Sequence, residues 1–141
     1  MKLLKTIQMT QTGWGVALLR VILGIIFIRE GSGKLLGWFG GVGPAATGAF
    51  FAQLGIPFPQ FNAYLVGLTE FLGGLAFLAG FLTRLAVIPI VVTMMGAIMT
   101  AKEASSWNHP LLIIAASLSL LQAGAGPLSL DRRLSKDRRS E

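Results

Sequence analysis

Residues 62–82, NAYLVGLTEFLGGLAFLAGFL, form an apolar run of membrane-spanning length that carries one carboxylate, Glu70, near its middle. A helix needs about 20 mostly apolar residues to cross a bilayer, and a charged residue at its centre costs roughly 2.5–3.5 kcal/mol. Charged side chains inside membranes therefore face the protein interior, pair with one another and often mark a functional site. The run predicts a spanning helix whose Glu70 is buried against another segment. A structural ion pair that only fixes helix packing is the alternative interpretation.

The composition is that of an integral membrane protein. Of the 141 residues 53% are hydrophobic and 13% charged, and the mean hydropathy is +0.69. We therefore expect a single membrane domain over 1–141. The absence of cysteine excludes disulfides and thiolate chemistry, and a single histidine argues against a metal site. The net charge of +6 does not point to nucleic acid, because the basic residues sit at the ends of the hydrophobic segments.

The hydrophobic pattern predicts an all-α fold, a bundle of four transmembrane helices. Thr83 and Arg84 form nearly the whole loop between the second and third spans, so these spans should be antiparallel neighbours. Asn108 is the expected N-cap of the fourth span, ahead of Pro110. A short interfacial helix is expected over 45–54 in the first outer loop. The four spans are expected at about 13–37, 62–82, 85–101 and 110–123, followed by a basic tail over 128–141.

The first apolar segment follows Lys2 and Lys5, as the hydrophobic region of a signal peptide does. Arg20 interrupts that segment, however, and no small-residue cleavage site precedes polar sequence. Three more hydrophobic segments also follow. We therefore expect the N-terminal segment to be retained as a span.

The distribution of lysine and arginine predicts the orientation in the membrane. The outer side has only Lys102. Because positively charged loops stay in the cytoplasm, both termini are expected there. The cations expected on the cytoplasmic side are two in the N-terminal lead, one in the loop between the second and third spans, and five in the tail: Lys2, Lys5, Arg84, Arg132, Arg133, Lys136, Arg138 and Arg139.

Two arginines compete as partners for Glu70. On a helix, residues three and four apart share a face, so Arg20 and Lys34 lie on one face of the first span and Arg29 on the opposite face. Arg29 lies about 24 Å from the cytoplasmic end of its span, Glu70 about 20 Å and Arg20 about 10 Å. Depth therefore favours Arg29 as the partner of Glu70, with Arg20 as the alternative. Glu70 shares its face with glycines, so this face should pack against the first span.

Glu30 and Lys34 are spaced four residues apart, in the order that favours an ion pair. They form either a weak interfacial pair or part of a polar pocket that opens outward and is completed by Arg29, Glu70 and His109. His109 changes charge near neutral pH, but a histidine in a loop is also commonly just solvated. The candidate ligand-binding or proton-relay residues are Glu70, Arg29, Glu30, Lys34, His109 and Arg20.

Several stretches resemble the DoxX family of small bacterial inner-membrane proteins. The resemblance implies a four-helix membrane bundle in the bacterial inner membrane. It places Arg20, Lys34, Glu70 and Arg84 at recurrent polar positions of the family, whereas Glu30 stands where relatives often have histidine. The stretches that carry it are LLRVILGIIF (18–27), EGSGKLLG (30–37), GAFFAQLGIPFP (48–59), AYLVGLTEFLGGLAFLAGFLTRLA (63–86) and GAGPLSLDRRL (124–134).

The resemblance also implies a link to quinone-coupled oxidation or to oxidative-stress complexes. The first hypothesis is therefore a membrane oxidoreductase subunit that binds a quinone or similar redox molecule in the outer half of the bundle. Arg29 or Lys34 would contact the quinone carbonyls and Glu70 or Glu30 would relay protons, while a partner redox subunit supplies electrons. No residue is assigned as catalytic. The alternatives are a non-catalytic scaffold and a small transporter, which would require a homo-oligomer.

Overall fold

The computed structural model describes the backbone of residues 13–137 and the side chains of 13–134. Four long helices dominate it, and no strand occurs within this part of the chain. The expected all-α fold is confirmed. The long helices are α2 (Trp14–Leu36), α4 (Pro59–Ala79), α5 (Thr83–Thr100) and α6 (Asn108–Ala123), and the short ones are η1 (Trp38–Gly40), α3 (Gly43–Gln53), η2 (Ala104–Trp107) and α7 (Leu130–Asp137).

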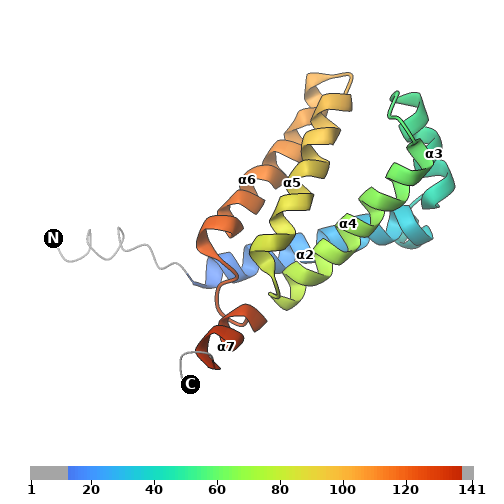
Figure 1. Ribbon diagram of the computed structural model, residues 1–141. Coiled ribbons are helices and arrows are strands. Elements are labelled where there is room, and N and C mark those ends of the chain that lie inside the picture. The colour runs from blue at the N-terminus through green and yellow to red at the C-terminus, as the bar shows by residue number, and fades with distance from the viewer. Residues whose placement is uncertain (1–12, 138–141) are drawn as a thin grey trace.

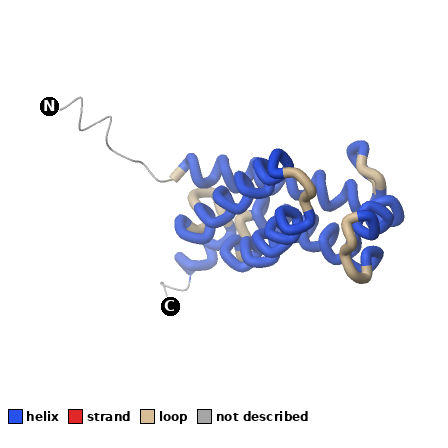
Figure 2. Tube along the Cα trace, turned by 90° about the horizontal axis from the view of Figure 1, so that it is seen from above, coloured by secondary structure: helices blue, strands red, loops and turns tan. Residues whose placement is uncertain are grey.

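The long helices form two pairs, α2 with α4 and α5 with α6 (Figure 1). The pairs meet at the end of the molecule where α4 turns into α5, and they diverge away from that turn. Helix α3 packs against α4 at the far end of the first pair, whereas α7 lies near the shared end. The view from above shows the helices side by side, with connections only at their ends (Figure 2). The two ends of α2 consequently have different surroundings.

Glycines bring α2 and α4 into backbone contact. A Cβ atom added at Gly31 would stand 2.7 Å from the carbonyl oxygen of Gly67, and one added at Gly74 would stand 2.6 Å from the amide nitrogen of Ile28. Small residues allow such close approach of helices in a membrane. The expectation that the glycine face around Glu70 packs against the first span is therefore confirmed.

One apolar core lies at the end where the pairs meet, and all four long helices contribute to it. Phe27 of α2 and Phe77 of α4 pack edge to face, with ring centroids 6.2 Å apart and an interplanar angle of 63°. Around this pair lie buried side chains from the other two helices. The core comprises Leu23, Phe27, Phe77, Val87, Ile90, Met94, Ile113 and Leu120.

Two local expectations about helix ends are wrong. The turn between α4 and α5 covers Gly80 to Leu82, not Thr83 and Arg84, because α5 already begins at Thr83. Asp131 of α7 makes this possible, since its two carboxylate oxygens accept hydrogen bonds from the amides of Leu82 at 2.8 Å and Thr83 at 3.0 Å. Asn108 is not an N-cap but the first residue of α6, preceded by η2.

The polar tail contains a helix where the sequence predicted only a basic segment. Residues 130–137 form α7, and the preceding segment returns toward the start of α2, with Ala125 and Ser129 buried. Of the cations in the orientation prediction, Lys2, Lys5, Arg138 and Arg139 lie outside the described residues, as does the side chain of Lys136. Arg84, Arg132 and Arg133 lie within them.

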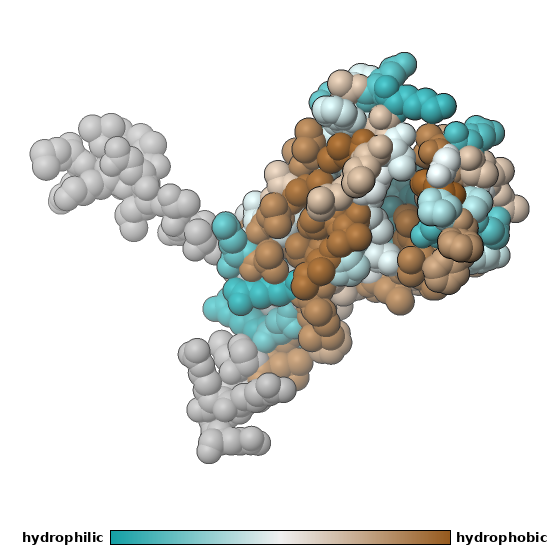
Figure 3. Space-filling model, turned by 45° about the horizontal axis from the view of Figure 1, so that its top comes forward, coloured by the Kyte–Doolittle hydropathy of each residue, from teal (hydrophilic) through white to brown (hydrophobic). Residues whose placement is uncertain are grey.

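The surface of the helix pairs is strongly apolar. In Figure 3 the hydrophobic side chains gather in the middle of the face shown, with polar residues toward its ends. Ile88, Val92 and Met99 of α5 are 56%, 62% and 84% exposed. By length and composition, α4 and α5 are the described helices that could cross a membrane. An apolar surface of this extent is normally covered by lipid or by protein.

Candidate functional site

Glu70 lies in the interface between α2 and α4 and is only 3% exposed. The Nζ of Lys34 donates a hydrogen bond to its Oε2 at 2.6 Å. Because the glycines bring the two backbones together, a side chain from α2 reaches a carboxylate buried on α4. This contact is a short, charge-assisted hydrogen bond, which is stronger than a neutral one.

The expected pairing of Glu70 with Arg29, or alternatively with Arg20, is wrong. Arg29 does lie at nearly the same level as Glu70, because neighbouring Gly31 faces Phe71. Arg29 is on the exposed face of α2, however, and its side chain cannot cross its own helix. Lys34 is on the inner face, one turn farther out. Side chains lean toward the N-terminus of their helix, so Lys34 leans back toward Glu70.

Lys34 also contacts a second acid. Its Nζ lies 3.5 Å from Oε2 of Glu30, one turn earlier on α2. The exposed fractions of the side chains are 4% for Glu70, 24% for Lys34 and 52% for Glu30. We call these three residues the charged triad. It connects a buried carboxylate, through an ammonium group, with a carboxylate at the surface.

The triad can accept a further hydrogen-bonding group. A lysine ammonium has three N–H donors, and two of those of Lys34 point to carboxylates within the described chain. The remaining donor can bind a neutral or negative oxygen atom. A proton can also pass between neighbouring groups that lie within hydrogen-bond reach. The triad therefore has the components of a small polar binding site and of a proton relay.

His109 does not join the triad. It is exposed at the start of α6. That end of α6 lies at the far tip of the second helix pair, which diverges from α2 and α4 (Figure 1). The predicted five-residue pocket is therefore wrong in composition. The structure brings Glu30, Lys34 and Glu70 together, whereas Arg29 and His109 lie apart from them.

Arg20 has a different environment at the other end of α2. It is 1% exposed. Its guanidinium donates to the carbonyl oxygens of Phe77 at 2.5 Å, Leu78 at 2.9 Å and Leu128 at 3.2 Å. The last carbonyls of a helix have no partner within the helix, and a cation there also complements the helix dipole. Arg20 thus joins the end of α4 to the tail segment.

Sequence reasoning missed two of these contacts. The position of Lys34 on the glycine-bearing face of α2 was the available indication for its pairing with Glu70. The contact of Asp131 with the start of α5 joins residues 48 and 49 positions apart. No local pattern indicates such a contact.

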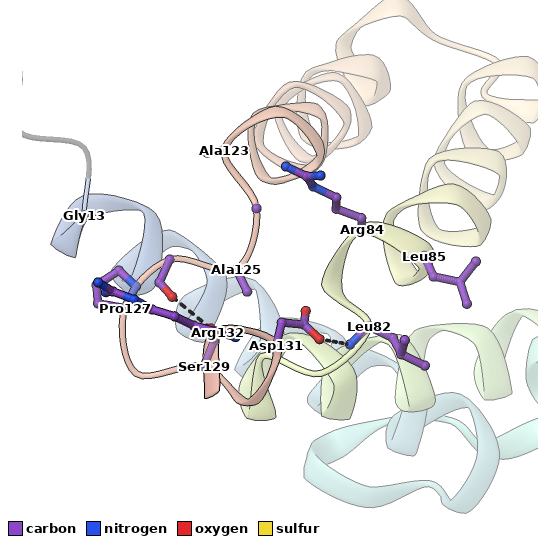
Figure 4. A pocket seen from close by; sticks show the side chains of 12 residues that line it. Gly13, Leu82, Arg84, Leu85, Ala123, Ala125, Pro127, Ser129, Asp131 and Arg132 are labelled. Atoms are coloured by element: carbon purple, nitrogen blue, oxygen red, sulfur yellow. Dashed lines mark hydrogen bonds between the residues drawn. The ribbon is translucent and has the colours of Figure 1, made fainter. Parts of the chain in front are cut away.

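Two surface depressions have linings that contain no triad residue. The first, of about 710 Å³, lies among Arg84, Asp131, Arg132 and the segment 123–127 (Figure 4). The second, of about 410 Å³, lies between α4 and α5 and is almost wholly apolar. Among the described side chains, those of residues 13–134, there is no group of three or more histidine, aspartate or glutamate residues that could hold a metal ion.

The chain is similar to known membrane proteins. The sequence pattern of the family described as DoxX matches residues 15–103. "Uncharacterized membrane protein Rv3486" of Mycobacterium tuberculosis is 33% identical over 138 residues, covering 86% of this chain and 82% of that protein. "Inner membrane protein YqjF" of Escherichia coli is 34% identical over 129 residues, covering 86% of this chain and 93% of that protein.

A third relative has a name that suggests an activity. "Putative oxidoreductase CatD" of Bacillus subtilis is 34% identical over 121 residues, covering 83% of this chain and 84% of that protein. No solved structure matches the chain at a significant level.

Proposed function

Since this chain belongs to the DoxX family of membrane proteins, we propose that it is a multi-pass protein of the bacterial inner membrane with both termini in the cytoplasm. Helices α2, α4, α5 and α6 are the four proposed spans of one domain. A relative is named an inner membrane protein. Arg84, Arg132 and Arg133 belong to the end where the helix pairs meet, and Lys102 follows α5 at the opposite end. This distribution favours a cytoplasmic location for the shared end.

We further propose that the charged triad binds a quinone or a similar small redox molecule, within an oxidoreductase or oxidative-stress complex. The observation that carries this proposal is the position of Lys34 between a buried and an exposed carboxylate. Intramembrane charges commonly mark functional sites. The name of one relative, a putative oxidoreductase, supports the same class of function.

The triad supplies two of the functions that quinone reduction requires. The ammonium of Lys34 donates to a quinone carbonyl oxygen and stabilises the negative charge that develops there. Reduction to the quinol also consumes protons, which Glu30 and Glu70 deliver from either side of Lys34. Electrons come from a partner redox subunit, because the chain has no cysteine to hold an iron–sulfur centre.

The test is a binding titration on the full-length protein in lipid nanodiscs, with decylubiquinone as the probe and calorimetry as the readout. We expect Glu70→Gln to raise the Kd at least about tenfold, a loss of about 1.4 kcal/mol. Arg133→Gln, which changes an exposed cation outside the triad, should leave the Kd unchanged. Absence of binding to the unaltered protein, or equal binding by Glu70→Gln, would refute the proposal.

A non-catalytic scaffold is the second candidate, and the 2.6 Å contact across the α2–α4 interface favours it. In that case Lys34 and Glu70 only hold two helices together. Removing one partner leaves an uncompensated buried charge, whereas removing both is often nearly neutral. The scaffold predicts that each single glutamine variant lowers the Tm, that the double variant recovers it, and that decylubiquinone changes none of these values.

A further inference from the structure

Two adjoining depressions that no triad residue lines have complementary chemistry. The first is partly polar and is lined by Arg84 of α5 and by Arg132 of α7, whose side chain extends toward Pro127 (Figure 4). The second is apolar and follows the α4–α5 interface. Both are lined by Leu82 and Leu85, so one continues into the other. Together they form a basic hollow with an apolar groove leading away from it.

The charged residues that line the basic hollow are two arginines, Arg84 and Arg132, and one carboxylate, Asp131. Both oxygens of Asp131 accept hydrogen bonds from backbone amides at the start of α5, and Figure 4 shows the carboxylate turned toward Leu82. The carboxylate keeps its charge, and its place at the N-terminus of α5 complements the helix dipole there. Arg84 is exposed and donates to the carbonyl oxygen of Gln122 at 3.3 Å, which leaves most of its guanidinium donors for a ligand.

The apolar groove runs along the two helices that are long and apolar enough to span a membrane. On α4 its lining extends from Leu65 to Ala76, a distance of about 17 Å along the helix axis. Leu72, in the middle of this stretch, is 58% exposed. The groove is therefore open to the surrounding lipid and elongated enough for a hydrocarbon chain.

We propose that the two depressions bind one anionic phospholipid, with its phosphate in the basic hollow and one acyl chain in the apolar groove. Guanidinium groups bind phosphate oxygens through paired, charge-assisted hydrogen bonds. The hollow lies at the ends of the spanning helices, where lipid headgroups lie. With the orientation proposed above, this is the cytoplasmic leaflet. The binding is independent of any ligand at the charged triad.

The test uses native mass spectrometry of the detergent-solubilised full-length protein, with phosphatidylglycerol and phosphatidylcholine of identical acyl chains as probes. We expect one phosphatidylglycerol to be retained, at least about tenfold more tightly than phosphatidylcholine. The double variant Arg84→Gln/Arg132→Gln should lose this preference. Arg29→Gln, which removes an exposed cation from the other end of α2, should retain it. The double variant Arg84→Lys/Arg132→Lys should keep most of the binding, because it keeps the charge.

A second pair of variants tests the groove. Leu72→Gln places a polar group in the groove and should weaken phosphatidylglycerol binding several-fold. Leu75→Gln is the matched control, since Leu75 is an exposed residue of the same helix that does not line the groove. Circular dichroism of each variant verifies that its helix content is unchanged.

Three results would overturn the proposal. Equal retention of the two lipids, or unchanged binding after loss of both arginines, would show that no anionic-lipid site exists there. An equal loss in Arg29→Gln would assign binding to overall charge. Displacement of the lipid by decylubiquinone, or by a second copy of the chain, would assign the depressions to that occupant instead.

Discussion

The two ends of α2 hold an inward-facing cation in different ways. Near its start, Arg20 donates to main-chain carbonyl oxygens of α4 and of the tail segment. Near its end, Lys34 donates to two carboxylates. Carbonyl oxygens neither gain nor lose protons at accessible pH, whereas carboxylates do. The same pair of helices is therefore fixed at one end and chemically responsive at the other.

The two ends of α2 also differ in how accessible their cations are from the surface. Arg20 is 1% exposed, and its partners are the ends of a helix and of a loop. Lys34 is partly exposed, and Glu30 continues the chain of charges to the surface. A ligand can approach the triad without unfolding the helix pair. The comparison indicates that structural and functional demands on α2 are separated along its length.

The largest predicted loss of stability is caused by substitution of Arg20. Arg20→Met removes a buried cation and its hydrogen bonds to the carbonyl oxygens of Phe77, Leu78 and Leu128. The carbonyl oxygen of Phe77 keeps the amide of Gly80 as a partner, so the expected cost is about 3 kcal/mol of stability. The measurement is thermal unfolding of the detergent-solubilised protein. Arg133→Met is the control and should unfold like the unaltered protein. If Arg20→Met also unfolds at the unaltered Tm, the hydrogen bonds of Arg20 at the start of α2 do not contribute to stability, which would contradict the comparison.

The second largest predicted loss of stability comes from the close contact of α2 with α4 between the two ends of α2. Gly31→Ala places a methyl group against the α4 backbone, and such overpacking should cost about 1–3 kcal/mol. Gly15 is also on α2 but has nothing within 4 Å of an added Cβ. Gly15→Ala should therefore be neutral or raise the Tm, because alanine favours helices. Equal effects at the two glycines would contradict backbone contact between α2 and α4.

Asp131 belongs to the fixed end, and we expect a moderate effect there. Asp131→Ala removes the acceptor for the amides of Leu82 and Thr83. Loss of such a helix cap costs about 0.5–2 kcal/mol. Hydrogen exchange should accelerate at these two amides. Glu103→Ala, at the opposite end of α5, should not change their exchange, and unaltered exchange in Asp131→Ala would exclude the cap.

The smallest effect on stability is expected at Glu30, in the responsive end. Its side chain is 52% exposed, and an exposed ion pair contributes about 0–1 kcal/mol. Glu30→Gln should thus leave the Tm nearly unchanged. A loss as large as that in Glu70→Gln would mean that Glu30 helps to hold the helices together, which would weaken the distinction between the two ends.

The positions of the helices followed largely from the sequence. Long apolar runs bounded by glycine, proline and polar residues predicted each of the four long helices to within a few residues. The prediction that Glu70 is buried against α2 was also correct. Both results rest on composition and periodicity, which are local properties of the chain.

The contacts between helices were harder to predict. The depth of the residues in the membrane suggested Arg29 as the partner of Glu70. Lys34 is the partner instead, because it lies on the face of α2 that packs against α4, whereas Arg29 lies on the exposed face. Asp131 meets the start of α5 only because the tail folds back along the end of α2. The divergence of the two helix pairs, which separates His109 from the triad, depends on packing angles. No sequence pattern specifies them.

The most direct measurement of the central claim uses the double variant Lys34→Gln/Glu70→Gln. Removing both charges should leave the helix pair nearly as stable as before, so thermal unfolding can verify that the protein is folded. Decylubiquinone binding is then measured by calorimetry. We predict a folded protein whose Kd for the quinone analogue has risen at least about tenfold. A folded double variant that binds the analogue as tightly as the unaltered protein would contradict a functional charged triad.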